Sequence, residues 1–472
     1  MTLRSKPEEE NMTYHNQLPL RVKLCYSAGS FAKAAQGLMI SVFLLYFYTD
    51  CLKLSPDTAA NIIFWGRIWD IINDPIAGAI IDRTHSHHGR CRFFLRWFSI
   101  PAGVLLTLCF IVPQINQRGL MVWALISFML QSCTSTITAI PINTLMGHLS
   151  SDATQRAQLN QLSLFMSLAA NYLFMAYMFR LIDLFGHGDI RRGYLFAGII
   201  FGLAYAIPCM VVYWGTRGYE TVGASEGKIE RTGKEPLHLR ALLSNRIWIV
   251  VCIIYLFYTA ATVMENNAMV YYFQYVFGSK NMLTTYSAVS TACNLIMFFA
   301  LPRFVKRFGN SGCTAIGCSC GFAGHLIRFV LRDGTAAVRI AGWGVSNLGI
   351  ALVSGTVMLN IFDSVVYGEW KTGVKHDALL ISGFTVASKA GMAIGGASVG
   401  WLLSTVPYVE SAAKQASEVL ELLFRLNTLI PAAAFAVALM LVVPLVKNEK
   451  RIPQMRNIIA LRSKENSSYE EN

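Results

Sequence analysis

The sequence predicts an all-α membrane protein whose twelve transmembrane helices form two bundles of six. Three observations carry this prediction. Of the 472 residues, 54% are hydrophobic and only 14% are charged, a balance too apolar for a soluble protein of this length. The apolar residues fall into twelve runs that are long enough to cross a bilayer. One longer polar stretch, 216–246, separates the first six runs from the last six.

The twelve runs divide the chain into five parts. We expect an amino-terminal tail at 1–23, a first six-helix bundle at 24–215, a central loop at 216–246, a second bundle at 247–446 and a carboxy-terminal tail at 447–472. The amino-terminal tail is polar and lacks the apolar core of a cleaved signal, so the first run is expected to insert the chain. The runs are 24–49, 57–81, 94–113, 120–147, 158–185, 193–215, 247–276, 284–302, 312–331, 336–361, 377–404 and 422–446.

Positive charge predicts the orientation. Lys and Arg are concentrated in both tails and in the loops that follow even-numbered runs, so the positive-inside rule predicts that both termini are cytoplasmic. This distribution also explains the net charge of +13 without nucleic-acid binding, because the charge is spread over short loops beside a membrane. The lipid bilayer is therefore the expected partner of this surface.

The sequence carries no sign of an enzyme. It contains no Ser-His-Asp arrangement and no kinase-type motif, and we expect no cofactor other than a coupling cation. Most of the eleven cysteines lie singly inside apolar runs. They predict neither a disulfide framework nor a thiolate metal site.

The second run contains the charged residues around which the function is predicted. Arg67, Asp70 and Asp74 are spaced three and four residues apart, so they share one helical face, which Asn73 adjoins. Ionisable groups at this depth in a membrane segment are functional by default. Pro75 frees a backbone carbonyl one turn earlier, which adds an oxygen ligand. The pattern predicts a site for a small hard cation.

A structural alternative uses the same charges. Arg67 could pair with an acid of its own helix, and the cluster would then serve only helix packing. Two acids and one base, however, leave one negative charge that needs a partner inside the membrane. A bound Na⁺ or a proton would supply that partner, with Asp70 and Asp74 as its ligands.

Twelve runs in two halves are the plan of the major facilitator superfamily, whose substrate site lies near the midplane between the halves. Four motifs, taken in this order and spacing, resemble the melibiose-permease family of glycoside, pentoside and hexuronide:cation symporters. The resemblance extends from about residue 24 to the twelfth run. The motifs are Tyr46-Phe-Tyr-Thr-Asp50, Trp69-Asp-Ile-Ile-Asn-Asp-Pro75, Asp82-Arg-Thr-His-Ser-His-His-Gly89 and Asp363-Ser-Val-Val-Tyr-Gly-Glu-Trp-Lys-Thr-Gly373.

The resemblance implies cation coupling through the amino-terminal half. The family's coupling acids fall on Asp70 and Asp74, and its neighbouring amide falls on Asn73. Lys389 lies too deep in its apolar run to reach either surface easily, which favours a pairing with these acids. A neutral lysine that serves only packing is the alternative. The family positions that lie near the acids are all kept, as Thr136, Thr385 and Lys389.

The sugar site is where the sequence departs from that family. Lys33 is kept, but the acid that follows it in melibiose permeases is replaced by Ala34. The acid of the fourth run becomes Ala139, the aromatic after it becomes Asn143, and the Arg of the fifth run becomes Leu164. Because the missing groups hold galactoside hydroxyls in that family, we do not expect a melibiose-like disaccharide.

The polar residues that remain in the predicted cleft favour an anionic solute. Two acids are absent and one lysine remains, which suits a uronide or a sulfonated sugar. Glu265 is open to two interpretations: it contacts the substrate, or it pairs with Lys33 or with His325 and Arg328 of the ninth run. The candidate substrate residues are Lys33, Gln36, Thr138, Asn143, Glu265 and Asn266.

The expected function is symport of a small sugar-like solute, coupled to Na⁺ or H⁺, by alternating access. The solute classes are uronides, pentosides, glycosides and sulfonated sugars. The alternatives are an exporter or facilitator of a small organic anion, and a non-transporting membrane sensor or lipid-handling protein on the same fold. Intact coupling residues favour a transporter, because a sensor does not need a displaceable cation. We expect a monomer in a bacterial inner membrane.

Overall fold

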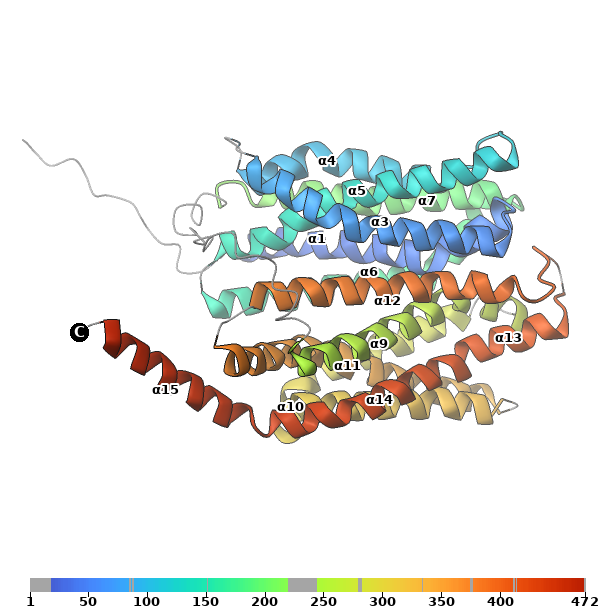
Figure 1. Ribbon diagram of the computed structural model, residues 1–472. Helices are drawn as coiled ribbons and strands as arrows, with labels where there is room; N and C mark the ends of the chain where they lie inside the picture. The colour runs from blue at the N-terminus through green and yellow to red at the C-terminus, as the bar shows by residue number, and fades with distance from the viewer. Residues whose placement is uncertain are drawn as a thin grey trace, which may run out of the picture.

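The part of the chain that the structure describes is built from helices. The computed structural model describes residues 18–470 except for 85, 87–88, 151, 220–243, 279–281, 333, 374–376, 411 and 413. Most of the expected amino-terminal tail and of the expected central loop therefore lies outside the described residues, as do three positions of the third motif quoted above. Figure 1 shows the helices of the first half of the chain beside those of the second half.

The first half forms six long helices. Pro56 begins the second of them, at a position where the missing N–H of proline costs no helical hydrogen bond. The first helix consists of α1 (Leu20–Leu38), η1 (Met39–Phe43), α2 (Leu44–Tyr46) and η2 (Phe47–Cys51), where η marks a π-helical turn. The others are α3 (Pro56–Arg83), α4 (Arg90–Leu108), α5 (Gln117–Leu149), α6 (Ala153–Gly186) and α7 (Ile190–Gly215).

The second half repeats this plan and ends in one further helix. Thr428 has non-helical backbone angles and separates the two segments of the twelfth span. The elements are α9 (Arg246–Tyr271), η3 (Tyr272–Val276), α10 (Met282–Val330), α11 (Ala336–Thr372), α12 (Asp377–Leu403), α13 (Ser417–Asn427), α14 (Leu429–Glu449) and α15 (Ile452–Glu470).

Twelve membrane spans result. Ten described helical stretches are long and apolar enough to cross a membrane. The helix α3 is not among them, because Arg67, Asp70 and Asp74 lie in its middle and lower its hydropathy. The helix α10 counts once among the ten but contains two spans, which correspond to the predicted runs 284–302 and 312–331. The predicted all-α fold with twelve spans is confirmed.

The two spans of α10 meet at Gly309. This residue has φ 76° and ψ 176°, a backbone conformation that favours glycine. The helical segment that follows is capped from the end of α14, where the Glu449 carboxylate accepts from the backbone N–H groups of Asn310 and Ser311. A carboxylate satisfies the free N–H groups of a helix start and suits the positive end of its dipole. The sequence analysis did not find this link.

The expected carboxy-terminal tail contains a helix that we did not predict. The helix α15 follows α14 after a short turn, and Figure 1 shows it leading to the carboxy terminus. Arg462 Nη1 donates to the Trp370 backbone carbonyl at 2.9 Å, which attaches α15 to α11. The segment 452–470 is too polar to form an apolar run, which is why the sequence did not predict a helix there.

The two halves contact each other directly at the end of the bundle opposite the carboxy terminus. There Thr49 Oγ1 lies 2.7 Å from the Tyr271 hydroxyl. The Asp50 carboxylate accepts hydrogen bonds from the hydroxyls of Tyr275 at 3.2 Å and Tyr408 at 2.9 Å. Asp50 is only 2% exposed. We call the following five residues the Asp50 contact: Thr49, Asp50, Tyr271, Tyr275 and Tyr408.

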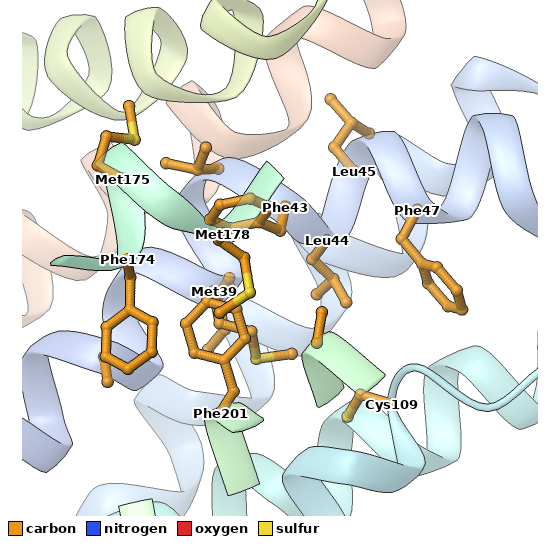
Figure 2. Close-up of a cluster of buried hydrophobic side chains, with 14 of the residues drawn as sticks. Met39, Phe43, Leu44, Leu45, Phe47, Cys109, Phe174, Met175, Met178 and Phe201 are labelled. Atoms are coloured by element: carbon orange, nitrogen blue, oxygen red, sulfur yellow. The ribbon is translucent and has the colours of Figure 1, made fainter. Parts of the chain in front are cut away.

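Buried apolar side chains pack the first half beneath this contact. Met39 and Phe43 of η1 and Met178 of α6 are fully buried (Figure 2). The rings of Phe174 in α6 and Phe201 in α7 stack with their centroids 4.8 Å apart. These contacts join α1, α6 and α7 into one packed unit, so the polar residues of α1 are held on a rigid support.

Small residues bring α12 close to α9. A Cβ atom added at Gly391 would lie 2.1 Å from the Thr259 hydroxyl oxygen, and one added at Gly395 would lie 2.3 Å from the Ala260 carbonyl oxygen. No side chain fits at such distances, which is the usual reason for small residues between membrane helices. On its other side α12 packs against α3, so it contacts both halves of the chain.

We expect Gly395→Ala to lower the thermal unfolding midpoint of the purified protein. The added methyl group would meet backbone atoms of α9 that cannot rotate away, and such overpacking costs about 1–3 kcal/mol. The matched control is Gly147→Ala, since nothing lies within 4 Å of a Cβ at that position. It is expected to leave the midpoint unchanged or raise it slightly. Equal midpoints for both variants would contradict the close packing of α12 on α9.

Candidate functional site

Lys389 of α12 lies between the two acids of α3. Its Nζ atom is 3.1 Å from Asp70 Oδ2 and forms a second ion pair with Asp74 Oδ2. It also donates to the Asp70 backbone carbonyl at 3.3 Å. Because α3 belongs to the first bundle and α12 to the second, this contact joins the two halves. We call Asp70, Asp74 and Lys389 the acid–lysine cluster.

Hydroxyl groups of α5 add oxygen atoms to the cluster. Ser132 Oγ donates to Asp70 Oδ1 at 2.7 Å. One turn later, Thr136 Oγ1 lies 3.4 Å from Asp70 Oδ1 and 3.3 Å from Asp74 Oδ1. The sequence analysis named Thr136 but missed Ser132. Ser132 lies four residues before Thr136 and therefore on the same helical face, and this spacing was the feature that would have indicated it.

The other residues singled out for the cation site have different surroundings. Asn73 is buried, and its Nδ2 atom has no hydrogen-bond partner among the described residues. Arg67 Nε is also buried without a hydrogen-bond partner among the described residues. The described ion pairs of Asp70 and Asp74 are formed with Lys389 and not with Arg67. The Thr385 hydroxyl donates to the Ile381 carbonyl of its own helix at 3.1 Å. The described contacts thus join Asp70, Asp74, Thr136 and Lys389 but not Thr385.

The acid–lysine cluster has the charge and the ligand atoms to accept one small cation. The three residues of the cluster carry a net charge of −1, which one Na⁺ or one proton would neutralise, and Arg67 on the same face of α3 has no described ion pair with either acid. The ligand atoms are carboxylate, hydroxyl and carbonyl oxygens, which hard cations prefer. The side chains of Asp70, Asp74 and Lys389 are 18%, 30% and 20% exposed, so the cluster is partly accessible.

Two of the six candidate substrate residues lie together in the first bundle. Lys33 Nζ of α1 donates to Asn143 Oδ1 of α5 at 2.6 Å. Asn143 is exposed, while Lys33 and Gln36 are half-buried. The positions that hold acids in melibiose permeases, Ala34 and Ala139, bring no negative charge to Lys33. The pair therefore presents an ammonium group and an amide on an accessible surface between helices.

The remaining candidates divide between buried and accessible positions. Thr138 is fully buried, and its hydroxyl lies 2.6 Å from the Tyr205 hydroxyl of α7, so it serves contact between helices. Asn266 is half-buried. Glu265 is buried and pairs with His325 and Arg328, which is the second of the two interpretations open from the sequence. The substrate role of Thr138 and of Glu265 stays a prediction beside these contacts.

Comparison with known families identifies the class of protein. A family model described as MFS/sugar transport protein matches residues 25–445. The chain belongs to this family. It is a multi-pass membrane transporter of the glycoside–pentoside–hexuronide:cation symporters within the major facilitator superfamily, and it is not an enzyme. The family suggested by the four motifs is thereby confirmed.

Relatives in the family are distant but extend over most of the chain. The isoprimeverose transporter of Lactiplantibacillus pentosus is 27% identical over 413 residues, which are 86% of this chain and 84% of that protein. The glucuronide carrier protein homolog of Escherichia coli is 24% identical over 84% of this chain and 86% of its own. A crystal structure of a D-xylose–proton symporter superposes with a TM-score of 0.64 at 14% identity, covering 91% of this chain and 98% of that one, which shows the shared fold.

Proposed function

We propose that this family member couples the movement of one small cation, Na⁺ or H⁺, to that of a small anionic sugar-like solute. The observation that carries the proposal is the acid–lysine cluster, which has a net negative charge at the contact between the two halves. A cation bound there would change the contact between α3 and α12. Ion occupancy would therefore act directly on the movement of one half against the other.

The Lys389 ammonium group competes with the cation for the two carboxylates. Its ammonium group occupies the position beside Asp74 that a cation would take. When the cation enters, Lys389 must withdraw from at least one carboxylate, and when the cation leaves, Lys389 restores the neutralising charge. Such exchange lowers the cost of an empty site inside the membrane, since isolated buried acids are unfavourable there.

An anionic solute is supported by Lys33 and by the absence of nearby acids. An ammonium group hydrogen-bonded to an amide suits a carboxylate or sulfonate, and Ala34 and Ala139 add no repulsion. The relatives are named for both kinds of solute, a neutral disaccharide in isoprimeverose and an anion in glucuronide. A uronide or a sulfonated sugar is the class that we propose for this chain.

The test is solute flux in proteoliposomes that contain the purified protein. A panel of uronides, sulfonated sugars and neutral pentosides is offered with an inward Na⁺ gradient, an inward H⁺ gradient or neither. Accumulation of an anionic solute under one gradient supports the proposal. Accumulation of neutral solutes alone, or flux that does not depend on either gradient, contradicts it.

Orientation-specific labelling of the termini would test the expected cytoplasmic location of both ends.

Replacement of Lys389 by Ala is expected to uncouple the solute from the cation. The two acids would keep their negative charge but lose the group that competes with the cation, so the cation would bind tighter and leave more slowly. The measurement is the dependence of solute flux on cation concentration. The matched control, Lys450→Ala, removes an exposed lysine and is expected to behave as wild type. Unchanged coupling in Lys389→Ala would show that Lys389 serves only helix packing.

A further inference from the structure

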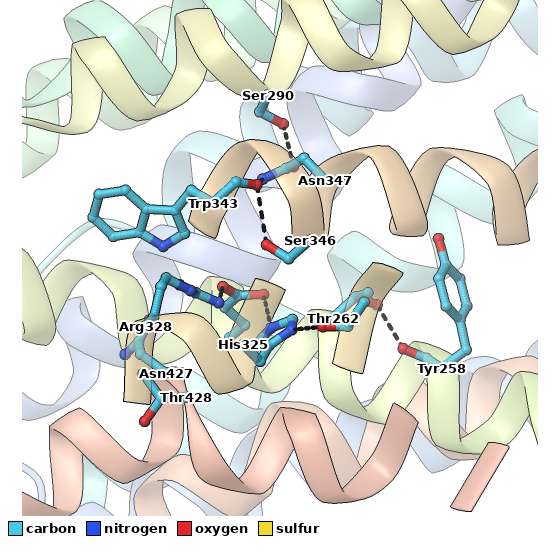
Figure 3. Close-up of polar contacts among 12 residues, drawn as sticks. Tyr258, Thr262, Ser290, His325, Arg328, Trp343, Ser346, Asn347, Asn427 and Thr428 are labelled. Carbon is cyan, nitrogen blue, oxygen red and sulfur yellow. Dashed lines mark hydrogen bonds and ion pairs between the residues drawn. The ribbon is translucent and has the colours of Figure 1, made fainter. Parts of the chain in front are cut away.

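A second charged cluster lies inside the second bundle, on elements other than those of the acid–lysine cluster. Arg328 Nη2 of α10 donates to Glu265 Oε1 of α9 at 2.8 Å, and His325 Nε2 lies 3.2 Å from Glu265 Oε2. The His325 side chain is 0% exposed and those of Glu265 and Arg328 are 4% exposed. Figure 3 shows His325 and Arg328 on neighbouring turns of α10. We call these three residues the Glu265 cluster.

The hydrogen-bond partner of the second ring nitrogen, Nδ1, shows which ring atom of His325 carries a proton. Nδ1 lies 2.6 Å from the Gly321 backbone carbonyl oxygen. A carbonyl oxygen can only accept a hydrogen bond, so Nδ1 must carry a proton. A neutral histidine has a single ring proton. If His325 were neutral, its Nε2 would therefore direct a lone pair at the Glu265 carboxylate.

One additional proton is needed between the two side chains. A lone pair and a carboxylate oxygen would repel each other at 3.2 Å in a buried setting. The conflict disappears if His325 is an imidazolium that donates to the carboxylate, or if Glu265 is a carboxylic acid that donates to Nε2. Both forms hold the same proton. We propose that His325 and Glu265 together bind one exchangeable proton, in a site distinct from that of Asp70 and Asp74.

Arg328 sets the net charge of the Glu265 cluster, and aromatic rings surround it. Arg328 remains charged at every physiological pH, so the cluster carries +1 with the proton and 0 without it. The Trp343 ring centroid is 5.5 Å from Arg328 Cζ, and Phe435 of α14 stacks on His325 with centroids 5.5 Å apart. Among the described residues, the titratable groups beside the cluster are Tyr286 of α10 and Tyr272 of η3, and Arg332 and Arg339 lie on the Tyr272 side.

The proton joins α10 to α9, and the same His325 ring also packs against α14. His325 of α10 contacts Glu265 of α9 through it and stacks on Phe435 of α14. Loss of the proton leaves the Arg328–Glu265 ion pair intact but makes the His325–Glu265 contact repulsive. Because the cluster is closed to solvent in this conformation, exchange of the proton requires α9 and α10 to separate. Proton release is therefore linked to a change in the packing of the second bundle.

The test measures unfolding of the full chain in detergent as a function of pH, and it does not depend on the proposed cation or solute. In wild type, the native state keeps a proton that an unfolded histidine loses above about pH 6.5. The unfolding equilibrium constant is therefore expected to rise with pH, by up to about tenfold per pH unit. In Glu265→Gln the amide N–H can donate to neutral His325, so this one-proton slope is expected to be absent.

The matched control is Glu421→Gln. Glu421 is an acid of the same half that pairs with Arg332 and Arg425 at the surface, so its variant is expected to keep the wild-type slope. A one-proton difference between wild type and Glu265→Gln, with none for Glu421→Gln, supports the proposal. Equal slopes for wild type and Glu265→Gln overturn it.

A second measurement decides the question if Glu265→Gln does not fold. In wild type labelled with [¹⁵N]histidine, the ring signal of His325 is assigned by NMR as the one that is lost in His325→Gln. A ring with a protonated Nδ1 and a proton on, or hydrogen-bonded to, Nε2 supports the proposal. A neutral ring with its only proton on Nε2 overturns it.

Discussion

Asp74→Asn is expected to abolish cation-driven accumulation of solute while the protein still inserts and folds. The change removes one of the two charges that pair with Lys389 but keeps the shape of the side chain. At an effective dielectric of about 20, a carboxylate about 4 Å from a cation contributes about 4 kcal/mol, and the partial exposure of this cluster reduces the effect to on the order of 2–4 kcal/mol, roughly 30- to 700-fold in cation affinity. Asp70→Asn is expected to act in the same way.

The measurement is the accumulation ratio in proteoliposomes under a cation gradient, with matched protein content. The control, Asp57→Asn, makes the same chemical change in the exposed first turn of the same helix, and it is expected to accumulate solute as wild type does. Full accumulation by both Asp74→Asn and Asp70→Asn would show that α3 does not couple the cation.

Ala34→Asp combined with Ala139→Asp is expected to weaken binding of an anionic solute strongly. With the solute bound beside Lys33 as proposed above, each new carboxylate would lie within several Å of it, and the one at position 34 would also compete for Lys33. At an effective dielectric of about 20, each unfavourable contact costs about 2–3 kcal/mol, roughly 30- to 150-fold in affinity. A neutral glycoside would respond in the opposite direction, because carboxylates accept hydrogen bonds from its hydroxyls.

The measurement is the dissociation constant of the solute with the cation saturating. Ala34→Asn combined with Ala139→Asn is the matched control, since asparagine has the size of aspartate without its charge. A large loss of affinity in the aspartate variant alone supports an anionic solute. Tighter binding by the aspartate variant would return the substrate to the neutral glycosides of the family.

The span count and the face of α3 could be predicted because both depend on local periodicity. The charged face of Asp70 and Asp74 follows from residue spacing alone. The depth of Lys389 in its apolar run favoured a pairing with these acids, and the family resemblance supported it, since no local rule says which of twelve helices faces another. The cap on the second half of α10 by Glu449 was missed for the same reason, because 138 residues separate Ser311 from its acceptor.

The candidate site was predicted less completely than the fold. Ser132 was missed because serine is common between membrane helices, although its spacing of four residues from Thr136 places it on the face that meets Asp70. The neighbour of Thr138 could not be predicted, and two sets of partners stayed open for Glu265, because helical periodicity shows that residues share a face without showing which neighbour that face meets. Glu265 faces α10 and Thr138 faces α7, and neither orientation follows from spacing along one helix.

The Asp50 contact has a consequence for the speed of the transport cycle. Two hydroxyl groups of the second half, from Tyr275 and Tyr408, donate to one carboxylate of the first. A hydrogen bond to a charged group contributes about 1.5–3 kcal/mol, so separating the halves at this end must break several kcal/mol of contact before water can replace it. We expect this cost to fall on reorientation and not on solute capture. Cooling is expected to slow net flux far more than it changes the affinity for solute.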